Sequence, residues 1–398
     1  MIFEKRVVGY LSAAPRVSTR IDAEATGPRA HVLGVMTGFN DLGWDVKPFI
    51  VGNQVPLRWS SQGSESELRK GRLRTFAADL IRLTMGPINA RRAWKEIGGQ
   101  VSLVYERFAV LQSLGNIFRQ HNIPWILETN ALYFQEAANE RDSLMLTGLA
   151  RRLEINAYQK CDVLICVSQV LKNIIAQEAQ ISPDKIIVVP NGVDTIFFDP
   201  DKFSPKFTDD EITIGYVGHL YPWQGLDILL HAMSEIRCED GITFQLCIVG
   251  DGPIRTELDQ LVKKLNLSPH VRFLGLVPWE DVPGHIVKFD IGYSNKVLNN
   301  TTKMYFSPLK IYEYMAMAKP VLCSDEKGAP RVIQHQKTGF TFPATDIKYL
   351  RNVLRQIYES RDQLPMMGKQ ARQEAVTHHS WGNRVSFISE EIKRILHK

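Results

Sequence analysis

The chain has 398 residues, of which 44% are hydrophobic and 23% charged, so its size and composition suit two or three folded domains. A net charge of +5 does not demand a nucleic-acid partner, and we expect none. No stretch approaches the roughly 18 apolar residues of a membrane-spanning helix, and the apolar run after Met1 is too short for a signal peptide. Five cysteines in mainly apolar runs favour buried thiols over disulfides or zinc, so we expect a cytoplasmic protein.

Short apolar runs alternate with helical stretches along the first half of the chain. The pattern predicts strands at residues 6–11, 44–51, 101–105, 124–128, 162–168 and 185–190. It predicts helices at residues 28–42, 109–121, 144–160 and 169–179. Strands separated by helices indicate a parallel sheet that helices cover on both faces.

The segment 67–97 departs from this alternation. Lys and Arg outnumber Asp and Glu in it, and large apolar residues are interleaved with them. A basic, amphipathic helix of this kind is typical of proteins that lie on an anionic membrane surface. A solvated helix whose apolar side belongs to the core also explains the pattern, and the membrane interpretation gains weight only if the substrate is a lipid.

The alternation restarts after a polar stretch at 199–211. Strands are predicted at residues 212–217, 244–250, 271–276, 290–294 and 320–324. The simplest architecture is α/β, with two Rossmann-like, doubly wound domains that face a cleft, the default ligand site of such folds. We place the domains at 1–197 and 198–376, and we expect the amphipathic helix at 377–398 to pack back across their junction.

The turn GYVGHLYPWQG, at 215–225, leads from an apolar strand through Gly218 into a helix. Free N–H groups at the start of a helix favour anions, and strand–glycine–helix turns hold phosphate groups in many proteins. This turn nevertheless contains no Lys or Arg. Any positive charge beside a phosphate must therefore come from elsewhere in the chain.

The segment SPLKIYEYMAMAKPVLCS, at 307–324, predicts a helix that begins at Pro308 with Ser307 as its cap. Lys310 falls in the first turn and Glu313 one turn later on the same face. One interpretation is a surface ion pair, worth roughly a few tenths of a kcal/mol. The other is that Glu313 accepts both hydroxyls of a ribose while Lys310 meets the attached phosphates. This helix alone does not decide between them.

Several other catalytic motifs are absent from the sequence. The segment GDGPIRTELDQL, at 250–261, has glycines between a strand and a helix, but Pro253 and Arg255 break the dinucleotide fingerprint. A nicotinamide-dependent dehydrogenase is therefore disfavoured. The sequence contains no Walker motif, HExxH or Gly-x-Ser-x-Gly elbow. Asp199 and Asp201 have Asp-x-Asp spacing in the presumed linker, where we interpret them as loop residues rather than metal ligands.

Together these stretches resemble the family 4 glycosyltransferases, which have the two-domain GT-B fold. The amino half is similar loosely, through TGPRAHVLG around Gly27 and through CDVLICVS. The resemblance is specific in the order and spacing of the motifs of the carboxy half, namely PNGVD (190–194), GYVGHLYPWQGLDILL (215–230), IVGDGPIRTEL (248–258), VRFLGLVPWEDVP (271–283), SPLKIYEYMAMAKPVLCSD (307–325) and HQKTGFTFPATD (335–346).

The resemblance implies a retaining hexosyltransferase of surface polysaccharide or glycolipid biosynthesis. The donor would be a UDP- or GDP-sugar bound by the carboxy-terminal domain, and the acceptor a glycan or lipid-linked hydroxyl bound by the amino-terminal one. The resemblance implies no metal or other cofactor. It also implies that the leaving phosphate itself helps to take the acceptor proton, so that no dedicated side-chain base is required. A lipid acceptor would attach the protein peripherally to the inner face of the membrane.

The resemblance also assigns residues of the donor site. Glu313 aligns with the family's glutamate that binds the ribose, and Leu276 and Val277 align with the loop that meets the base. Gly218 and Gly250 belong to the two glycine turns, of which the first would let the diphosphate approach.

Two departures from the family pattern concern the same site. The family commonly has Arg and Lys where this chain has His219 and Gln224, and the first glutamate of its paired-glutamate motif falls on Tyr305. Lys303 and Lys310 are then the best candidates to supply the missing positive charge. Further cations near the first strand–helix loop are Arg16, Arg20 and Arg29.

The acceptor side is assigned from strand ends. In LETNA, at 127–131, Glu128 and Asn130 are candidates to hydrogen-bond an acceptor sugar or orient its hydroxyl, and with Lys310 they are the candidate catalytic residues. Tyr105, Glu106 and Arg107 end the preceding strand similarly. Two alternatives stay open: an enzyme that hydrolyses or epimerises a nucleotide-sugar, and a non-catalytic GT-B scaffold or sugar-binding protein with a degenerate donor site.

Overall fold

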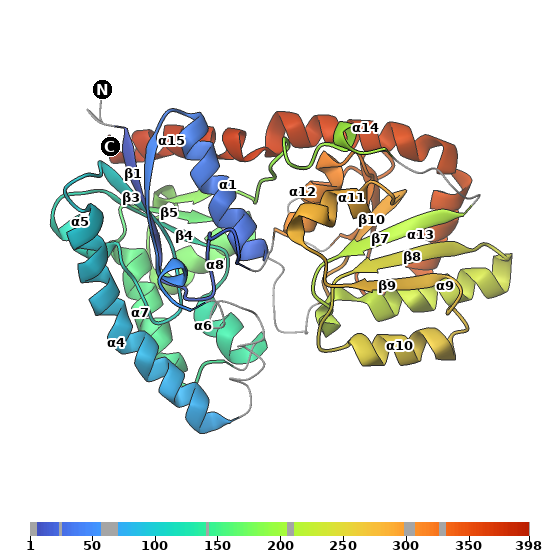
Figure 1. Ribbon diagram of the computed structural model, residues 1–398, viewed down its shortest axis with the longest axis horizontal. Helices are drawn as coiled ribbons and strands as arrows, with labels where there is room; N and C mark the ends of the chain where they lie inside the picture. Colours follow the sequence, from blue (N-terminus) through green and yellow to red (C-terminus); the bar gives the residue numbers. More distant parts are fainter. Residues whose placement is uncertain are drawn as a thin grey trace. The chain divides into compact units, whose positions relative to one another are not determined.

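The computed structural model describes residues 6–23, 26–56, 71–140, 143–204, 211–297, 307–325 and 332–397. They form two compact units. The first unit is Met1–Pro190 together with Trp381–Lys398, and the second unit is Asn191–Ser380. Each unit is a six-stranded parallel sheet with helices on both faces (Figure 1), so the predicted α/β fold of two Rossmann-like domains is confirmed.

The first unit has the strand order β2-β1-β3-β4-β5-β6, with every neighbouring pair parallel. Its strands are β1 (Val7–Ser12), β2 (Asp45–Ile50), β3 (Leu103–Arg107), β4 (Trp125–Thr129), β5 (Val163–Cys166) and β6 (Ile186–Val188). Its helices are α1 (Gly27–Asp41), α4 (Arg72–Ile97), α5 (Asn116–Gln120), α6 (Tyr133–Gln135), α7 (Thr147–Lys160), α8 (Gln169–Ala179) and α15 (Trp381–Leu396). The inner strands are apolar runs because both of their faces are buried.

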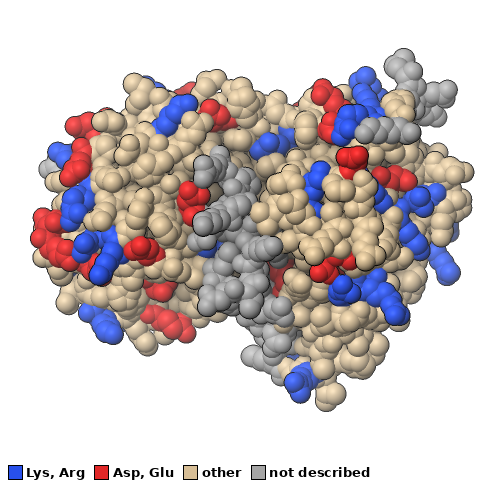
Figure 2. Space-filling model, turned by 180° about the vertical axis from the view of Figure 1, so that it is seen from behind, with Lys and Arg blue, Asp and Glu red and all other residues tan. Residues whose placement is uncertain are grey.

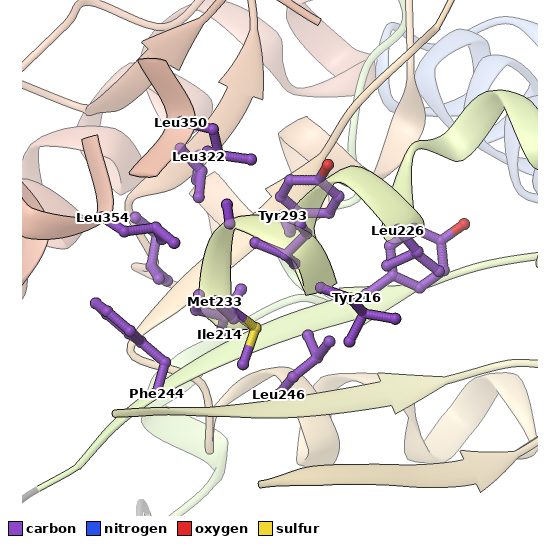
Figure 3. Close-up of a cluster of buried hydrophobic side chains, with 14 of the residues drawn as sticks. Ile214, Tyr216, Leu226, Met233, Phe244, Leu246, Tyr293, Leu322, Leu350 and Leu354 are labelled. Atoms are coloured by element: carbon purple, nitrogen blue, oxygen red, sulfur yellow. The ribbon is translucent and has the colours of Figure 1, made fainter. Parts of the chain in front are cut away.

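The second unit has the order β12-β11-β10-β7-β8-β9, which read from β9 is the strand order of dinucleotide-binding folds. Its strands are β7 (Ile212–Val217), β8 (Phe244–Val249), β9 (Val271–Gly275), β10 (Ile291–Ser294), β11 (Val321–Ser324) and β12 (Gly339–Phe342). Its helices are α9 (Leu226–Asp240), α10 (Arg255–Lys264), α11 (Val282–Ile286), α12 (Leu309–Ala316), α13 (Ile347–Glu359) and α14 (Leu364–Glu374). In its core, Ile214 and Leu246 of the sheet meet Met233 of α9, with Leu350 and Leu354 of α13 beside them (Figure 3).

One predicted helix is much shorter in the structure. The prediction spanned 109–121, whereas α5 covers only Asn116–Gln120. The buried carboxylate of Glu106 accepts hydrogen bonds from the backbone N–H groups of Leu114 and Gly115, at 2.7 and 2.8 Å. Leu111 has a left-handed backbone, with φ of 63°. These features hold the preceding residues as a loop, because a side-chain acceptor competes with helical hydrogen bonding.

The last helix, α15, belongs to the first unit, where it packs against α1 (Figure 1). Two glycines one helical turn apart on α1 permit this contact. A Cβ on Gly34 would lie 2.1 Å from Nε1 of Trp381, and a Cβ on Gly38 would lie 2.6 Å from Cγ2 of Val385. The indole of Trp381 therefore occupies the space that a side chain at position 34 would need.

The surface carries charges of both signs. On the face that Figure 2 shows, Lys and Arg side chains lie among Asp and Glu side chains, without a large field of one sign. Within the part of the chain that the structure describes, no helix combines the length and the apolar character needed to cross a membrane.

The close approach of α1 and α15 can be tested by adding one methyl group. We expect Gly34→Ala to lower the free energy of unfolding by about 1–3 kcal/mol, because the methyl group overpacks the contact with Trp381. Urea denaturation of the full chain measures this change. Gly382→Ala, at a glycine of α15 with no atom within 4 Å of the added Cβ, should leave stability unchanged or slightly raised. Equal stability of both variants would contradict the packing described.

Candidate functional site

The switch point of the second unit's sheet is where strand order reverses, between β7 and β10. Open α/β sheets bind ligands at this point, outside the carboxyl ends of the strands. Gly218 follows β7 directly, and α12, which carries Lys310 and Glu313, is the first described helix after β10. The two segments singled out from sequence therefore converge on the place where this fold binds ligands.

Gly218 and Gly250 bring two loops into direct contact. Gly218 donates its N–H to the carbonyl of Val249 at 2.9 Å, and Gly250 donates to the carbonyl of Gly275 at 2.7 Å. A Cβ on Gly250 would lie 2.0 Å from the carbonyl oxygen of Gly218. Their φ angles of 137° and 135° also disfavour any other residue. Both N–H groups are thus engaged within the unit, and the glycines let the loops after β7 and β8 meet.

Lys310 supplies positive charge beside Gly218. A Cβ on Gly218 would lie 3.1 Å from Nζ of Lys310. The ammonium also lies 4.0 Å above the ring centroid of Tyr216 and donates a hydrogen bond to Oε1 of Gln224 at 3.1 Å. The structure therefore brings Gly218, Gln224 and Lys310 together. Tyr216 was not anticipated, since its position inside β7 marks it only as a core residue.

Lys310 and Glu313 have strongly shifted protonation equilibria. Burial lowers the pKa of Lys310 to about 7, opposed by the charge of Glu313 and aided by that of Lys296. Burial raises the pKa of Glu313 to about 7, opposed by the charge of Lys310. Both groups can therefore change charge near neutral pH in response to a ligand. Titratable groups shifted in this way are typical of functional sites.

The start of α12 is fixed by Asn191 of the Pro-Asn-Gly turn. The helix begins at Leu309 with Pro308 as its cap residue, one position later than predicted. Ser307 does not cap the helix with its side chain. Its hydroxyl accepts from the backbone N–H of Asn191 at 3.0 Å, and its carbonyl accepts from the Asn191 side chain. A turn that local sequence marks only as a turn thus positions the helix that carries Lys310.

The remaining residues of the 215–225 turn form an aromatic group. His219 accepts a hydrogen bond at its carbonyl from the Tyr216 hydroxyl, at 2.7 Å, and its ring lies 6.1 Å from that of Tyr221. Tyr221 and Trp223 stack at 4.3 Å, and Nζ of Lys296 lies 5.1 Å above the Trp223 ring. Tyr221, Trp223 and Lys296 were not anticipated from sequence.

Leu276 and Val277 follow β9, next to the loop that Gly250 contacts. The side chain of Leu276 is 67% exposed, whereas Val277 packs against the core of the second unit. Of this predicted pair, Leu276 is the one available to a ligand. Lys303 and Tyr305 lie outside the described residues.

Glu128 and Asn130 belong to the first unit, at the carboxyl end of β4. Glu128 is buried, and one of its oxygens lies 2.7 Å from Nε2 of His31. Burial alone would favour the neutral carboxyl, but His31, Arg107 and Tyr105 outweigh it, so the pKa of Glu128 is lowered. The Glu128 carboxylate is therefore charged at neutral pH. Its pairing with His31 could not be foreseen, because nothing local connects α1 to β4.

The arginines of the first strand–helix loop are engaged within their own unit. Arg20 donates to the carbonyls of Asn53 and Val55 at 3.2 and 3.0 Å, and Arg29 donates to the carbonyl of Arg20 at 3.2 Å. These guanidinium groups hold the loop after β1 in place. Arg16 also has an interaction in the structure.

Comparison with known proteins bears on both halves of the chain. The model for Glycosyltransferase Family 4 matches residues 27–197, and that for Glycosyl transferases group 1 matches residues 197–374. The GDP-mannose-dependent alpha-(1-6)-phosphatidylinositol monomannoside mannosyltransferase of Mycobacterium tuberculosis is 26% identical over 52% of this chain and 55% of its own length. The putative colanic acid biosynthesis glycosyltransferase WcaL of Escherichia coli is 27% identical over 54% of this chain and 51% of its own. The chain thus spans about half the length of these curated relatives.

Solved structures share the fold at low sequence identity. Sucrose-phosphate synthase from Thermosynechococcus elongatus aligns with a TM-score of 0.70 at 16% identity, over 99% of this chain and 100% of that one. A glycosyltransferase from Rickettsia africae aligns with 0.67 at 17% identity, over 99% of both chains. Anabaena HepE in complex with UDP aligns with 0.66 at 17% identity, over 98% of this chain and 100% of that one.

These matches agree with the two parallel sheets and with the ordered motifs that converge on the switch point of the second sheet. The two family models together extend over residues 27–374. The chain therefore belongs to the family 4 glycosyltransferases and has the GT-B fold.

Proposed function

We propose that this chain transfers a sugar, with retention of configuration, from a nucleotide-sugar donor to a hydroxyl of a glycan or lipid-linked acceptor, in surface polysaccharide or glycolipid biosynthesis. The observation that carries the proposal is the ammonium of Lys310 beside Gly218, at the switch point of the second unit's sheet. A cation at this edge suits a diphosphate. The M. tuberculosis relative is named for a GDP-mannose donor and HepE was solved with UDP, which supports a nucleoside diphosphate and leaves the base open.

Each residue of the donor site has a proposed task. Glu313, one turn after Lys310, accepts the ribose hydroxyls, because an ionised carboxylate accepts through both oxygens. Leu276 meets the base from its exposed position after β9. Gln224 orients the Lys310 ammonium through their hydrogen bond, and His219 completes the turn around the diphosphate.

The proposed chemistry follows from charge. Breaking the bond between sugar and phosphate leaves a nucleoside diphosphate, so the protein must stabilise negative charge that develops on phosphate oxygens. Lys310 meets this charge, and an anion beside its nitrogen favours the ammonium form. In this proposal the leaving phosphate helps to take the acceptor proton, and no metal takes part.

The acceptor is assigned to the first unit. Glu128 and Asn130 hydrogen-bond the acceptor at the carboxyl end of β4, and the contact with His31 fixes the orientation of the Glu128 carboxylate. Such a positioned, charged carboxylate can orient the hydroxyl that attacks the donor sugar. A side chain with this task must keep one geometry, which burial and the His31 contact provide.

Nucleotide binding tests the donor proposal directly. Calorimetry with UDP, GDP and ADP should show that one nucleotide binds, and Glu313→Ala should weaken this binding about tenfold or more, because hydrogen bonds to the ribose are lost. Glu257→Ala, at an exposed residue of α10, is the matched control. If no nucleotide binds, the degenerate-site alternative replaces the proposal.

The pH dependence of nucleotide binding should be bell-shaped, with its maximum near pH 7. Above its pKa of about 7, Lys310 loses its proton, so nucleotide affinity falls. Because the bound nucleotide favours the ammonium form, binding at pH 8 takes up protons. Below its pKa of about 7, Glu313 is protonated, so nucleotide affinity falls. Because the bound ribose favours the carboxylate form, binding at pH 6 releases protons. Calorimetry in buffers of different ionisation enthalpy measures both effects.

Two variants separate the limbs of this profile. Lys310→Arg should remove the alkaline limb, since a guanidinium does not lose its proton in this range. Glu313→Gln should remove the acid limb. A profile that stays flat from pH 6 to 8 in the unmodified protein would show that these two groups do not control binding.

We further propose that the described part of the basic segment, α4, lies on an anionic membrane surface. Its inner face holds Asp79, which is buried, pairs with Arg82 and accepts from the N–H groups of Met145 and Leu146. Its outer face is apolar and open to solvent. The exposed apolar residues are Leu73, Phe76, Leu80, Ile81 and Ile88, and the exposed cations at the two ends are Arg72, Arg74, Arg91, Arg92 and Lys95.

This arrangement argues against the alternative that α4 is a solvated helix whose whole apolar side lies in the core. Leu73 is 86% exposed and Ile81 is 62% exposed, so part of the apolar character is not used by the core. Exposed apolar residues flanked by cations suit an interface with anionic lipids. The relative named for a phosphatidylinositol monomannoside also supports a lipid-linked acceptor.

Liposome flotation tests the membrane proposal. We expect Arg91→Gln combined with Arg92→Gln to weaken binding to vesicles with anionic lipid about thirtyfold, at about 1 kcal/mol for each cation. The matched control is Lys263→Gln with Lys264→Gln, at two exposed cations of α10. Binding to neutral vesicles should be weak for all proteins. An equal loss in both double variants would point to nonspecific attraction.

A further inference from the structure

Three polar side chains from neighbouring strands form a row at the carboxyl edge of the first unit's sheet. Ser12 of β1 is in register with Arg107 of β3, which is in register with Glu128 of β4. Residues in register on a parallel sheet project from the same face, and neighbouring strands lie about 4.8 Å apart. Strand order reverses between β1 and β3, so this row occupies the switch point of its sheet.

An aromatic layer lies beside the row on the same face of the sheet. Tyr10 and Tyr105 are in register two residues before Ser12 and Arg107, and their rings stack with centroids 5.6 Å apart. Phe39 of α1 packs against Tyr105 at 5.7 Å. The positions of the polar groups are thus fixed by a buried, rigid layer of side chains.

Several polar atoms of this region have unused hydrogen-bonding capacity. Within the described residues, Tyr10 Oη, Ser12 Oγ, Arg107 Nη1, Glu128 Oε2 and Asn130 Oδ1 make no hydrogen bond of good geometry. The Glu128 carboxylate also interacts with Tyr105, and the Arg107 guanidinium interacts with Tyr133. A buried polar atom without a partner costs roughly 1–3 kcal/mol, and more when it is charged. Arg107 and Asn130 are only half-buried, so the group reaches the surface. A ligand that pairs with these atoms would recover that free energy.

The kinds of atom define the ligand. Arg107 Nη1 only donates, the oxygens of Glu128 and Asn130 only accept, and the hydroxyls of Tyr10 and Ser12 do both. A sugar hydroxyl also donates and accepts, so two adjacent hydroxyls can bridge Arg107 and Glu128. A phosphate or carboxylate could pair with Arg107 but would face the Glu128 carboxylate, and like charges repel.

The other cations near this edge do not make the site favourable for an anionic ligand. Arg20 and Arg29 already donate to backbone carbonyls of the loops that they support. His31 on α1 is in contact with Glu128, and its ring also packs edge-on against Trp381 at 4.9 Å. The cation in the row itself, Arg107, has a carboxylate as its in-register neighbour.

We infer that Ser12, Arg107, Glu128 and Asn130 bind two adjacent hydroxyls of an uncharged sugar or polyol ring. The inference rests on the proposed function and specifies its acceptor: the ring that enters the first unit carries no phosphate or carboxylate at the bound edge. Arg107 donates to one hydroxyl oxygen, and Glu128 accepts from the neighbouring hydroxyl. Asn130 accepts a further hydroxyl proton.

Ligand selectivity of the unmodified full chain is the first test. Calorimetry or saturation-transfer NMR should detect binding of methyl α-glucoside, methyl α-mannoside or myo-inositol, with and without UDP or GDP. Glucuronate and glucose 6-phosphate should bind about tenfold more weakly than the best uncharged probe. Stronger binding of the anions, or no binding of any uncharged probe, would overturn the inference.

A change of charge in the row is the second test. Glu128→Gln should weaken binding of the uncharged probe about tenfold, because hydrogen bonds to a charged group are lost, and should shift preference toward glucuronate. Glu178→Gln, which removes an ion pair of α8 with Arg151, is the matched control. Unchanged selectivity in folded Glu128→Gln would refute the assignment. If that variant does not fold, Asn130→Ala supplies the same comparison at a half-buried position.

Nucleotide binding in the same samples separates this inference from the proposed function. A protein that binds UDP or GDP but none of the uncharged probes loses only the inference about the acceptor. A protein that binds an uncharged probe but no nucleotide loses the donor proposal and keeps the sugar site.

Discussion

Parallel pairing brings the carboxyl ends of all strands to one edge of each sheet, and the proposed donor and acceptor sites depend on that constraint. In the second unit the edge places Gly218 after β7 and α12 after β10. In the first unit it aligns Ser12, Arg107 and Glu128. Residues far apart in sequence become neighbours because the direction and the order of the strands place them at the same edge of the sheet.

Lys310 and Glu313, at the edge of the second unit's sheet, reduce the stability of the fold at neutral pH. Folding lowers the pKa of Lys310 and raises that of Glu313. Each shift means that the folded state disfavours the group's charged form, so both cost stability at neutral pH. Apolar residues at these positions would be expected to stabilise the unit. Retention of charged groups where they weaken the fold is the pattern expected when binding requires them.

Much of the fold could be predicted because parallel sheets need apolar runs separated by helices. The predicted strands overlap eleven of the observed ones, from β1 to β11, whereas β12 was not predicted. β12 is only four residues, GFTF, and follows a turn. The helix predicted at 109–121 was too long, because Glu106 holds the preceding loop through contacts that local sequence does not reveal.

The candidate site was predictable where it depends on local geometry. Helical spacing puts Lys310 and Glu313 on one face, and the glycine turn marks Gly218. The contact of Lys310 with Tyr216 and that of His31 with Glu128 join distant segments, and one sequence contains no signal for them. The functional assignments of all these residues stay predictions that binding experiments must test. They include Gly218, His219, Gln224, Gly250, Leu276, Val277, Lys310 and Glu313 for the donor, and Glu128 and Asn130 for the acceptor.

The return of α15 to the first unit also sets the order in which this protein can be completed during synthesis. The second unit, Asn191–Ser380, is inserted between two parts of the first. The ribosome therefore finishes the second unit before it releases the helix that covers Gly34 and Gly38 on α1. Until Trp381 emerges, that surface of α1 is exposed on the nascent chain. We therefore expect the first unit to complete its folding only after α15 has been synthesised.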